Sequence, residues 1–195
     1  MGERHEEWHP EGYLDWVRHE IADYDRVQDE LVDATRRTFP SRILDLGTGS
    51  GETARRLLEA HPEARIACVD ASEAMLGAAR EVLGDRATFH VSQLEAELPE
   101  GPFTLVTSAF AIHHLTAAEK ERLFVRVAEA LRPGGRFVVG DVVLTGDPAK
   151  ATVELSDYDR PSSLADQLDW LTAAGLRPRV CWSERDLAVI AADKL

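Results

Sequence analysis

The chain contains 195 residues, 44% of them hydrophobic, and carries a formal net charge of −13 at pH 7. This length suits a single α/β domain with a sizeable core and leaves little room for a second domain. The acidic balance disfavours binding to DNA and to bulk RNA, because lysine and arginine dominate the recognition of phosphates.

The N-terminal segment is predicted to be helical. Residues 11–38 place apolar side chains three and four positions apart, which is typical of one amphipathic helix or of two helices with a bend. Residues 1–12 are charged and contain no apolar signal-peptide core, and no run is long enough for a membrane span. We therefore expect a cytoplasmic protein without membrane contact. His5, His9 and His19 lack a cysteine or carboxylate set that would complete a metal site, so no metal is predicted.

After residue 40 the sequence alternates between strand and helix patterns. Runs rich in β-branched residues predict strands at 42–46, 65–70, 87–92, 103–110 and 135–144. Helical patterns follow at 51–60, 72–83 and 116–131. Such alternation is typical of a doubly wound sheet in which the strands run parallel.

The C-terminal segment breaks this alternation. A helix is predicted over 162–175, and two strand-like runs follow it at 177–182 and 186–192. The connection between the two runs is too short for a parallel crossover, so they must pair as an antiparallel hairpin. The predicted fold class is therefore α/β, with a doubly wound, mostly parallel, seven-stranded sheet that ends in an antiparallel hairpin.

The stretch "LDLGTGSGE" turns from the first strand into a helix through Gly47, Gly49 and Gly51. Any α/β protein can use glycines in such a turn, so the glycines alone do not identify a ligand. Two known glycine-rich motifs, the dinucleotide fingerprint and the P-loop, can be compared with this stretch. A dinucleotide fingerprint requires a third glycine where Glu52 stands, and a carboxylate there would face the diphosphate. A P-loop is excluded, because no Gly-Lys-Ser/Thr follows.

This spacing, preceded by Asp45, resembles the cofactor loop of class I S-adenosylmethionine-dependent methyltransferases. At the end of the second strand, Asp70 is placed to accept hydrogen bonds from both ribose hydroxyls of a nucleoside. The stretches "ASEAML", "HVSQLEAELP", "FTLVTSAFAIHHL" and "LRPGGRFVVGD" resemble the second to fifth motifs of the same family, in the same order. The resemblance extends over about residues 42–140 and points to a small-molecule subgroup of uncertain substrate.

The resemblance implies a Rossmann-like fold, S-adenosyl-L-methionine as cofactor and S-adenosyl-L-homocysteine as product. The positions that it assigns to the cofactor are Tyr24, Asp45, Gly47, Thr48, Gly49, Gly51, Asp70, Ala71, Met75, Ser92, Gln93, Leu94 and Ser108. Residues 1–40 would form a helical segment that covers the cofactor, while residues 41–195 form the catalytic part of the same structural domain. Tyr24 fits the apolar face of its helix equally well.

The candidate catalytic residues are His113 and His114, which follow the fourth strand. Ligand crevices of open α/β sheets lie at this carboxyl edge. Imidazole titrates near neutrality, so either side chain could take a proton from a hydroxyl or amine, and His113 is preferred. The alternative is a purely structural role. Asp141 and the "SDYDRP" segment would line the acceptor pocket. The short connection before residue 162 predicts an open pocket, or one closed by the N-terminal helix or by the second subunit of a homodimer.

The leading functional hypothesis is methyl transfer to an oxygen, nitrogen or carbon of a small-molecule substrate. Three alternatives stay open: a tRNA-modifying methyltransferase, a carboxy-S-adenosylmethionine-type enzyme, and a non-catalytic module that binds the cofactor. A tRNA substrate would require a basic surface beside the cofactor pocket. Methylation of DNA bases is disfavoured, because "TSAFAI" lacks the Pro-Pro-aromatic tetrad of such enzymes.

Overall fold

The computed structural model describes residues 10–195, so His5 and His9 lie outside the described residues. The helices are α1 (Tyr13–Glu20), α2 (Tyr24–Thr35), α3 (Glu52–Ala60), α4 (Glu73–Leu83), α5 (Ala117–Ala130) and α6 (Leu164–Ala173). The strands are β1 (Arg42–Leu46), β2 (Arg65–Asp70), β3 (Ala87–Val91), β4 (Phe103–Ala109), β5 (Leu131–Leu144), β6 (Ser162–Ser163), β7 (Leu176–Glu184) and β8 (Leu187–Lys194). Short 3₁₀ turns are η1 (Gly84–Arg86), η2 (Ile112–His114) and η3 (Pro148–Lys150).

The sheet confirms the predicted fold class. Its main strand order is β3-β2-β1-β4-β5-β8-β7, in which β3 to β5 run parallel. Strand β8 pairs antiparallel with both β5 and β7, as the predicted C-terminal hairpin requires. The two-residue strand β6, which was not predicted, pairs with the end of β5 beside this sheet. Strand β5 also begins four residues earlier than expected, at Leu131 rather than Gly135.

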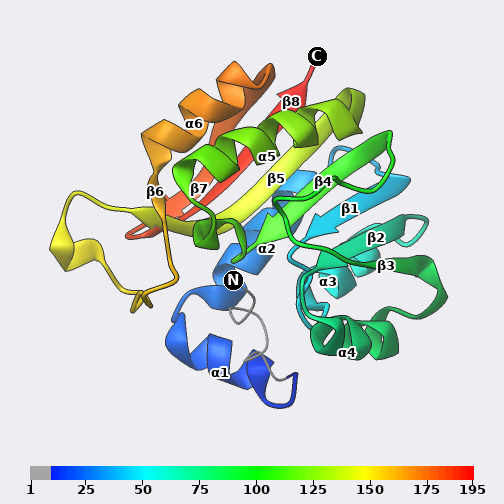
Figure 1. The fold of residues 1–195 in the computed structure, drawn as a ribbon, viewed down its shortest axis with the longest axis horizontal. Helices are drawn as coiled ribbons and strands as arrows, with labels where there is room; N and C mark the ends of the chain where they lie inside the picture. The colour runs from blue at the N-terminus through cyan, green and yellow to red at the C-terminus, as the bar shows by residue number, and fades with distance from the viewer. Residues whose placement is uncertain (1–9) are drawn as a thin grey trace.

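Helices cover both faces of the sheet, because side chains alternate between the faces along each strand (Figure 1). Ile43 of β1 packs in the core that includes residues of α1 to α4, whereas its neighbour Leu44 packs with residues of α5 and α6. Both leucine and isoleucine are fully buried. No helix within residues 10–195 combines the length and apolar character that a membrane crossing requires.

The N-terminal segment forms two helices with a bend, one of the two predicted forms. Helix α1 ends at Glu20 and α2 begins at Tyr24. Val27 and Leu31 of α2 are fully buried in the same core as the sheet. Helix α2 comes so close to β5 that a Cβ at Gly140 would lie 2.7 Å from Val27 Cγ1.

The carboxyl ends of the parallel strands meet at one edge, where the predicted functional residues also lie. Strand β1 leads there into the glycine turn, β4 into η2, and β5 into the 145–161 connection. Figure 1 shows α1 and the 145–161 connection at this edge. The fold therefore gathers segments that are distant in sequence at a single place.

We predict that Gly140→Ala destabilises the protein by about 1–3 kcal/mol, because the added methyl group overpacks the contact between α2 and β5. Denaturant unfolding would measure this loss. Gly146→Ala is the matched control, since no atom lies within 4 Å of a Cβ built at Gly146. The double variant Gly140→Ala/Val27→Ala should lose less stability than the sum of the losses of the two single variants, because Val27→Ala removes the crowded methyl group. Two fully additive losses would contradict the predicted contact.

Candidate functional site

The glycine turn packs directly against the segment that carries the histidine pair. Gly47, Gly49 and Gly51 have φ values of +70°, +56° and +94°, a backbone region that favours glycine. The N–H groups of Gly47 and Thr48 both donate to the Val69 carbonyl, at 2.8 and 3.0 Å, which ties the turn to β2. A Cβ at Gly47 would lie only 2.2 Å from the Cβ of Ala111, the residue before η2. Only glycine fits here.

Asp70 holds the other side of the turn. One carboxylate oxygen accepts from Gly49 N at 2.8 Å, and the other accepts from Ser72 N at 2.9 Å. Each oxygen of an ionised carboxylate has two lone-pair sites, so both keep acceptor capacity for a ligand. Ser72 also caps α4 by accepting from Met75 N at 3.3 Å. Asp70 is thus fixed at the end of β2 with its acceptor atoms beside the turn.

Asp45 lies beneath the turn with one oxygen unpaired. Its side chain is only 1% exposed; Oδ1 accepts from Thr107 Oγ1 at 2.7 Å, while buried Oδ2 has no hydrogen-bond partner. Burial raises the pKa of Asp45 to about 6, against the opposing effect of the hydrogen bond from Thr107. A buried acceptor without a donor is costly, so Asp45 Oδ2 marks a place where a ligand donor would be stabilising.

Two tyrosines from the N-terminal helices lie near this site. Tyr24 is buried and its ring stacks on Phe110, with centroids 5.1 Å apart. Burial raises the pKa of Tyr24 to about 12, so its hydroxyl stays neutral. Burial also raises the pKa of Tyr13, with smaller contributions from the nearby Tyr24 and Asp70. Helix α1 therefore reaches the region of Asp70, but cofactor coverage by residues 1–40 stays a prediction.

The remaining predicted cofactor residues divide into two groups. Met75 is buried, and a Cβ at Gly49 would lie 3.5 Å from its Cε. Ser92 N donates to the Asp70 carbonyl at 2.9 Å, so the segment after β3 adjoins the same site. Gln93 is exposed and Ala71 and Leu94 are half-buried.

Hydroxyls of the second group bond to the backbone within the fold. Ser108 Oγ donates to the Leu46 carbonyl at 2.8 Å, and Thr48 Oγ1 donates to the Asp45 carbonyl at 3.1 Å. Ser108 is fully buried between β4 and β1. Its hydroxyl stabilises the pairing of these strands, a use that the sequence pattern does not reveal.

His113 is held in place by Asp141 from β5. The His113 backbone N–H donates to Asp141 Oδ2 at 3.0 Å, and His113 Nδ1 lies 2.5 Å from Asp141 Oδ1. Both side chains are buried. Burial disfavours the charged imidazole, but the Asp141 carboxylate outweighs it and raises the pKa of His113. Because an ionised carboxylate only accepts, the proton on Nδ1 faces Asp141 and Nε2 points away from it.

His114 and Asp159 complete this cluster. His114 Nδ1 lies 2.9 Å from Asp159 Oδ1, and His113 Nε2 lies 3.5 Å from the same oxygen. The two imidazole rings are 4.0 Å apart. Burial and the neighbouring His113 lower the pKa of His114 to about 4. The 145–161 connection therefore contacts His113. That the acceptor pocket is open, or closed by the N-terminal helix or by a second subunit, stays a prediction.

Lys120, which was not among the predicted site residues, holds the end of the 145–161 connection in place. Its buried ammonium donates to the Arg160 carbonyl and, at 2.8 Å, to Ser162 Oγ. Arg160 N in turn donates to the His113 carbonyl at 2.7 Å. The available signal was a lysine on the apolar face of the predicted 116–131 helix, close to Leu123 and Phe124.

The charge of Glu52 is compensated by neighbouring arginines. Its carboxylate is 9% exposed and pairs with Arg55 at 2.9 Å, Arg56 at 2.7 Å and Arg18 at 3.5 Å. Burial raises the pKa of Glu52, but Arg55 and Arg56 outweigh burial and lower it. These cations neutralise the charge that was expected to repel a diphosphate. The charge of Glu52 is therefore a weaker argument against a dinucleotide than the sequence suggested.

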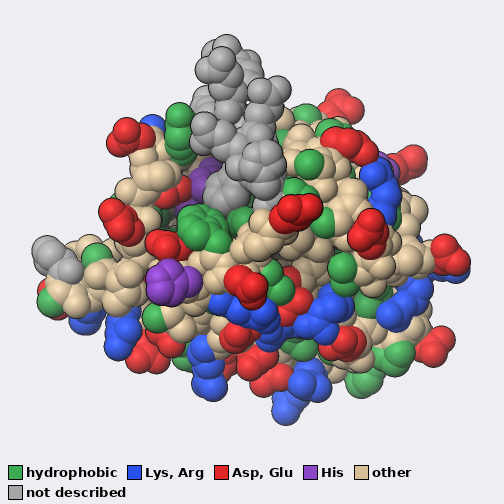
Figure 2. All heavy atoms as spheres, turned by 90° about the horizontal axis from the view of Figure 1, so that it is seen from below, with side chains coloured by type: hydrophobic (Ala, Val, Ile, Leu, Met, Phe, Trp, Pro, Cys, Tyr) green, Lys and Arg blue, Asp and Glu red, His purple; other side chains and the backbone are tan. Residues whose placement is uncertain are grey.

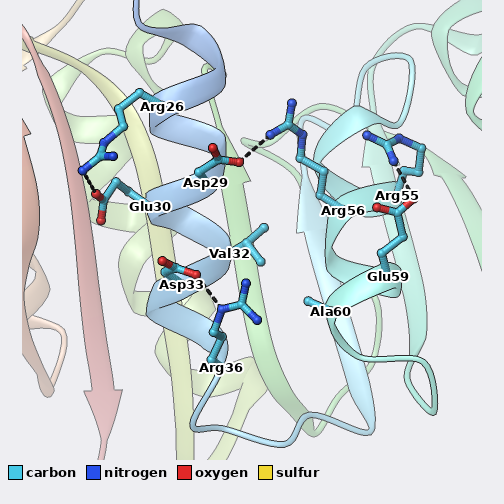
Figure 3. Close-up of a pocket in the computed structure, with 10 residues that line it drawn as sticks. All are labelled: Arg26, Asp29, Glu30, Val32, Asp33, Arg36, Arg55, Arg56, Glu59 and Ala60. Carbon is cyan, nitrogen blue, oxygen red and sulfur yellow. Dashed lines mark hydrogen bonds and ion pairs between the residues drawn. The ribbon is translucent and has the colours of Figure 1, made fainter.

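A groove of ≈ 690 Å³ lies between α2 and α3 (Figure 3). Its charged side chains pair with one another: Arg56 with Asp29 at 2.8 Å, Arg55 with Glu59 at 2.6 Å, Arg36 with Asp33 at 2.5 Å and Arg26 with Glu30 at 2.5 Å. Such exposed pairs contribute little stability and present no unpaired group that points to a ligand. The candidate site is therefore the strand edge rather than this groove.

Comparison with known proteins relates this arrangement to methyltransferases. A family model described as a methyltransferase domain matches residues 43–135. An uncharacterized methyltransferase from Geobacillus thermodenitrificans is 31% identical over 161 residues, which cover 82% of this chain and 72% of that relative.

Two solved structures share the fold. The S-adenosylmethionine-dependent methyltransferase SibL matches with a TM-score of 0.74 and 21% identity over 93% of this chain, but this chain spans only 58% of SibL. DhpI, solved as a complex with SAH, matches with a TM-score of 0.70 and 21% identity over 94% of this chain and 95% of its own.

We predict that Gly47→Ala destabilises the protein more than Gly134→Ala does. Both glycines have φ near +70°, at +70° and +72°, so an alanine is similarly strained at either position. Only Gly47 has a close neighbour, whereas no atom lies within 4 Å of a Cβ built at Gly134. The difference in unfolding free energy should be about 1–3 kcal/mol. Equal losses in thermal and denaturant unfolding would contradict the assigned contact with Ala111.

Proposed function

The chain belongs to the class I S-adenosylmethionine-dependent methyltransferases, and we propose that it transfers a methyl group to an oxygen, nitrogen or carbon of a small-molecule acceptor. S-adenosylmethionine is the methyl donor. The groups proposed to bind the donor are the glycine turn, Asp45 and Asp70. The side chains proposed to contact the acceptor are those of His113 and His114.

The residues at the ends of β1 and β2 fit this donor. Its amino-acid part carries an ammonium, and buried Asp45 Oδ2 is an acceptor that lacks a donor. Its ribose carries hydroxyls, for which Asp70 retains lone pairs beyond those used by Gly49 and Ser72. The unpartnered oxygen of Asp45 is the observation that carries the donor side of this proposal, because the ammonium of the donor would compensate its burial.

The acceptor side has to align a nucleophile and exclude water. S-adenosylmethionine supplies an electrophilic methyl group together with its own leaving group. His113, oriented through Nδ1 by Asp141, would accept through Nε2 the proton that a hydroxyl or amine acceptor loses as its bond to the methyl carbon forms. His114, whose ring lies 4.0 Å from that of His113, would contact the same acceptor.

The surface charge supports a small acceptor rather than RNA. On the face seen in Figure 2, lysine and arginine side chains are interspersed with aspartate and glutamate rather than gathered in one patch. Arginines near the glycine turn, including Arg18, Arg55 and Arg56, form ion pairs with acidic groups. Counterion release from a polyanion needs cations that are available to phosphates, and paired cations supply less of it.

The proposal is tested by incubating the purified protein with S-adenosylmethionine and a broad panel of phenols, amines, carboxylic acids and activated carbon acids. Mass spectrometry would detect S-adenosylhomocysteine and an acceptor that has gained a methyl group. With a hydroxyl or amine acceptor, His113→Asn should lower kcat about 100- to 10,000-fold while donor affinity is kept. Asp70→Asn should instead raise the Kd for the donor about 10- to 100-fold.

Asp85→Asn, an exposed aspartate in η1, is the control for the charge change. Tight donor binding without transfer to any acceptor would favour the non-catalytic module. Unchanged donor binding in the Asp70 variant would refute the assignment of the site.

Donor binding should weaken as the pH falls through about 6, the value to which burial raises the pKa of Asp45. The ionised carboxylate is the form that pairs with an ammonium, so below this pKa binding must displace a proton. The Kd should then rise about tenfold per pH unit, and calorimetry in buffers of different ionisation enthalpy should detect the released proton. Asp45→Asn should bind weakly with no such dependence. The same pH dependence in the variant would exclude Asp45 as its source.

A further inference from the structure

We infer that His113, His114 and Asp159 form a binding site for a divalent transition-metal ion such as Zn²⁺. Each side chain offers one ligand atom, and these atoms all lie within 4.8 Å of one another. Two imidazoles and one carboxylate form a donor set that is well known for zinc and for non-haem iron. The site does not depend on the proposed methyl transfer, since ion binding can be measured without donor or acceptor.

The separations of the ligand atoms suit a shared ion. Asp159 Oδ1 lies 2.9 Å from His114 Nδ1 and 3.5 Å from His113 Nε2. Ligands about 2.1 Å from a metal, at angles between octahedral and tetrahedral, lie about 3.0–3.4 Å from each other. An ion could therefore bind with small side-chain adjustments.

The carboxylate oxygen at the centre of this cluster is unsatisfied. The Asp159 side chain is only 10% exposed, and its Oδ1 is buried without a hydrogen-bond partner, although two ring nitrogens approach it. Native proteins rarely bury an acceptor in this way unless a ligand or an ion completes it. A cation beside Oδ1 would compensate the burial directly.

The groups around the cluster orient its ligands as a metal site requires. Asp141 accepts a hydrogen bond from Nδ1–H of His113, which leaves the Nε2 lone pair on the side of Asp159. A carboxylate behind a metal-binding imidazole fixes its tautomer and increases its basicity. Asp159 itself is held through Oδ2, which accepts from Ser156 N at 2.6 Å.

The path of the 145–161 connection is fixed at two further points. Asp186 accepts from Thr152 N at 2.5 Å and from Val153 N at 2.8 Å. At the other end, Arg160 N donates to the His113 carbonyl at 2.7 Å. Asp159 is thus presented to the histidines by an anchored segment, which reduces the ordering cost of binding an ion.

The charge balance permits a cation. Asp141 and Asp159 bring two carboxylates to the cluster, while Lys120 brings one ammonium that opposes cation binding. Ion binding would occupy the Nε2 lone pair of His113. Because the proposed proton transfer uses the same lone pair, a bound ion and proton acceptance by His113 exclude each other.

The test titrates Zn²⁺ into the chelator-treated full chain by isothermal titration calorimetry. We expect one ion per chain at this site, and Asp159→Asn and His114→Gln should each raise its Kd at least about tenfold. Asp157→Asn, an exposed aspartate of the same connection, is the matched control and should bind like the unmodified chain. Circular dichroism and thermal unfolding without metal would verify that each variant is folded.

Histidines of the N-terminal segment are the competing ligands. A variant carrying His5→Ala, His9→Ala and His19→Ala should keep the site. The inference is overturned if this triple variant loses the ion while Asp159→Asn retains it. It is equally overturned if both Asp159→Asn and His114→Gln bind Zn²⁺ as tightly as the unmodified chain.

Discussion

Because Gly47 lacks a side chain, the turn after β1 and the turn after β4, which carry the two halves of the candidate site, can come into contact. A Cβ at Gly47 would lie 2.2 Å from the Cβ of Ala111, so the backbone of the turn after β1 packs against the Ala111 methyl group in the turn after β4. The pairing of Leu46 with Ser108 in register fixes both turns to neighbouring strands. Methyl transfer depends on alignment over distances of about an ångström. A close-packed contact between two turns that are fixed to neighbouring strands supports such alignment.

The same edge concentrates buried acidic groups, at a cost to stability. Asp45, Asp141 and Asp159 have side chains that are at most about one-tenth exposed, and two of them keep an unpartnered oxygen. Other buried charges have partners: Glu52 pairs with three arginines, and Lys120 donates to a carbonyl and a hydroxyl. Of the three buried side-chain atoms without a partner among the described residues, two lie at this edge and the third, Arg126 Nε, lies in α5. Such a concentration is expected where a protein binds ligands, since local rules are broken mainly at functional sites.

The sequence was sufficient for the fold because its signals are local. Runs rich in β-branched residues, their alternation with helical patterns and the short tail connection predicted the sheet, and the glycine spacing with Asp45 and Asp70 predicted one side of the candidate site. The segment that contains Asp159 was predicted to line the acceptor pocket, but its contact with His114 was not, because it is made through an irregular connection distant in sequence. The bond from Lys120 to the Arg160 carbonyl, 40 residues away, was not predicted for the same reason. The bond from the Ser108 hydroxyl to the Leu46 carbonyl was not predicted either, because a strand pattern does not show which hydroxyl bonds to the neighbouring backbone.

The two N-terminal helices differ in how firmly they pack against the rest of the structure. Val27 and Leu31 of α2 are fully buried against the sheet, so displacing α2 would expose core residues at a cost of several kcal/mol. Helix α1 buries Val17, but its ion pair between Arg18 and Asp25, at 3.1 Å, is largely exposed and therefore weak. Since Tyr13 of α1 comes near Asp70, we expect that displacing α1 would expose the donor side of the candidate site at a smaller cost to the core than displacing α2.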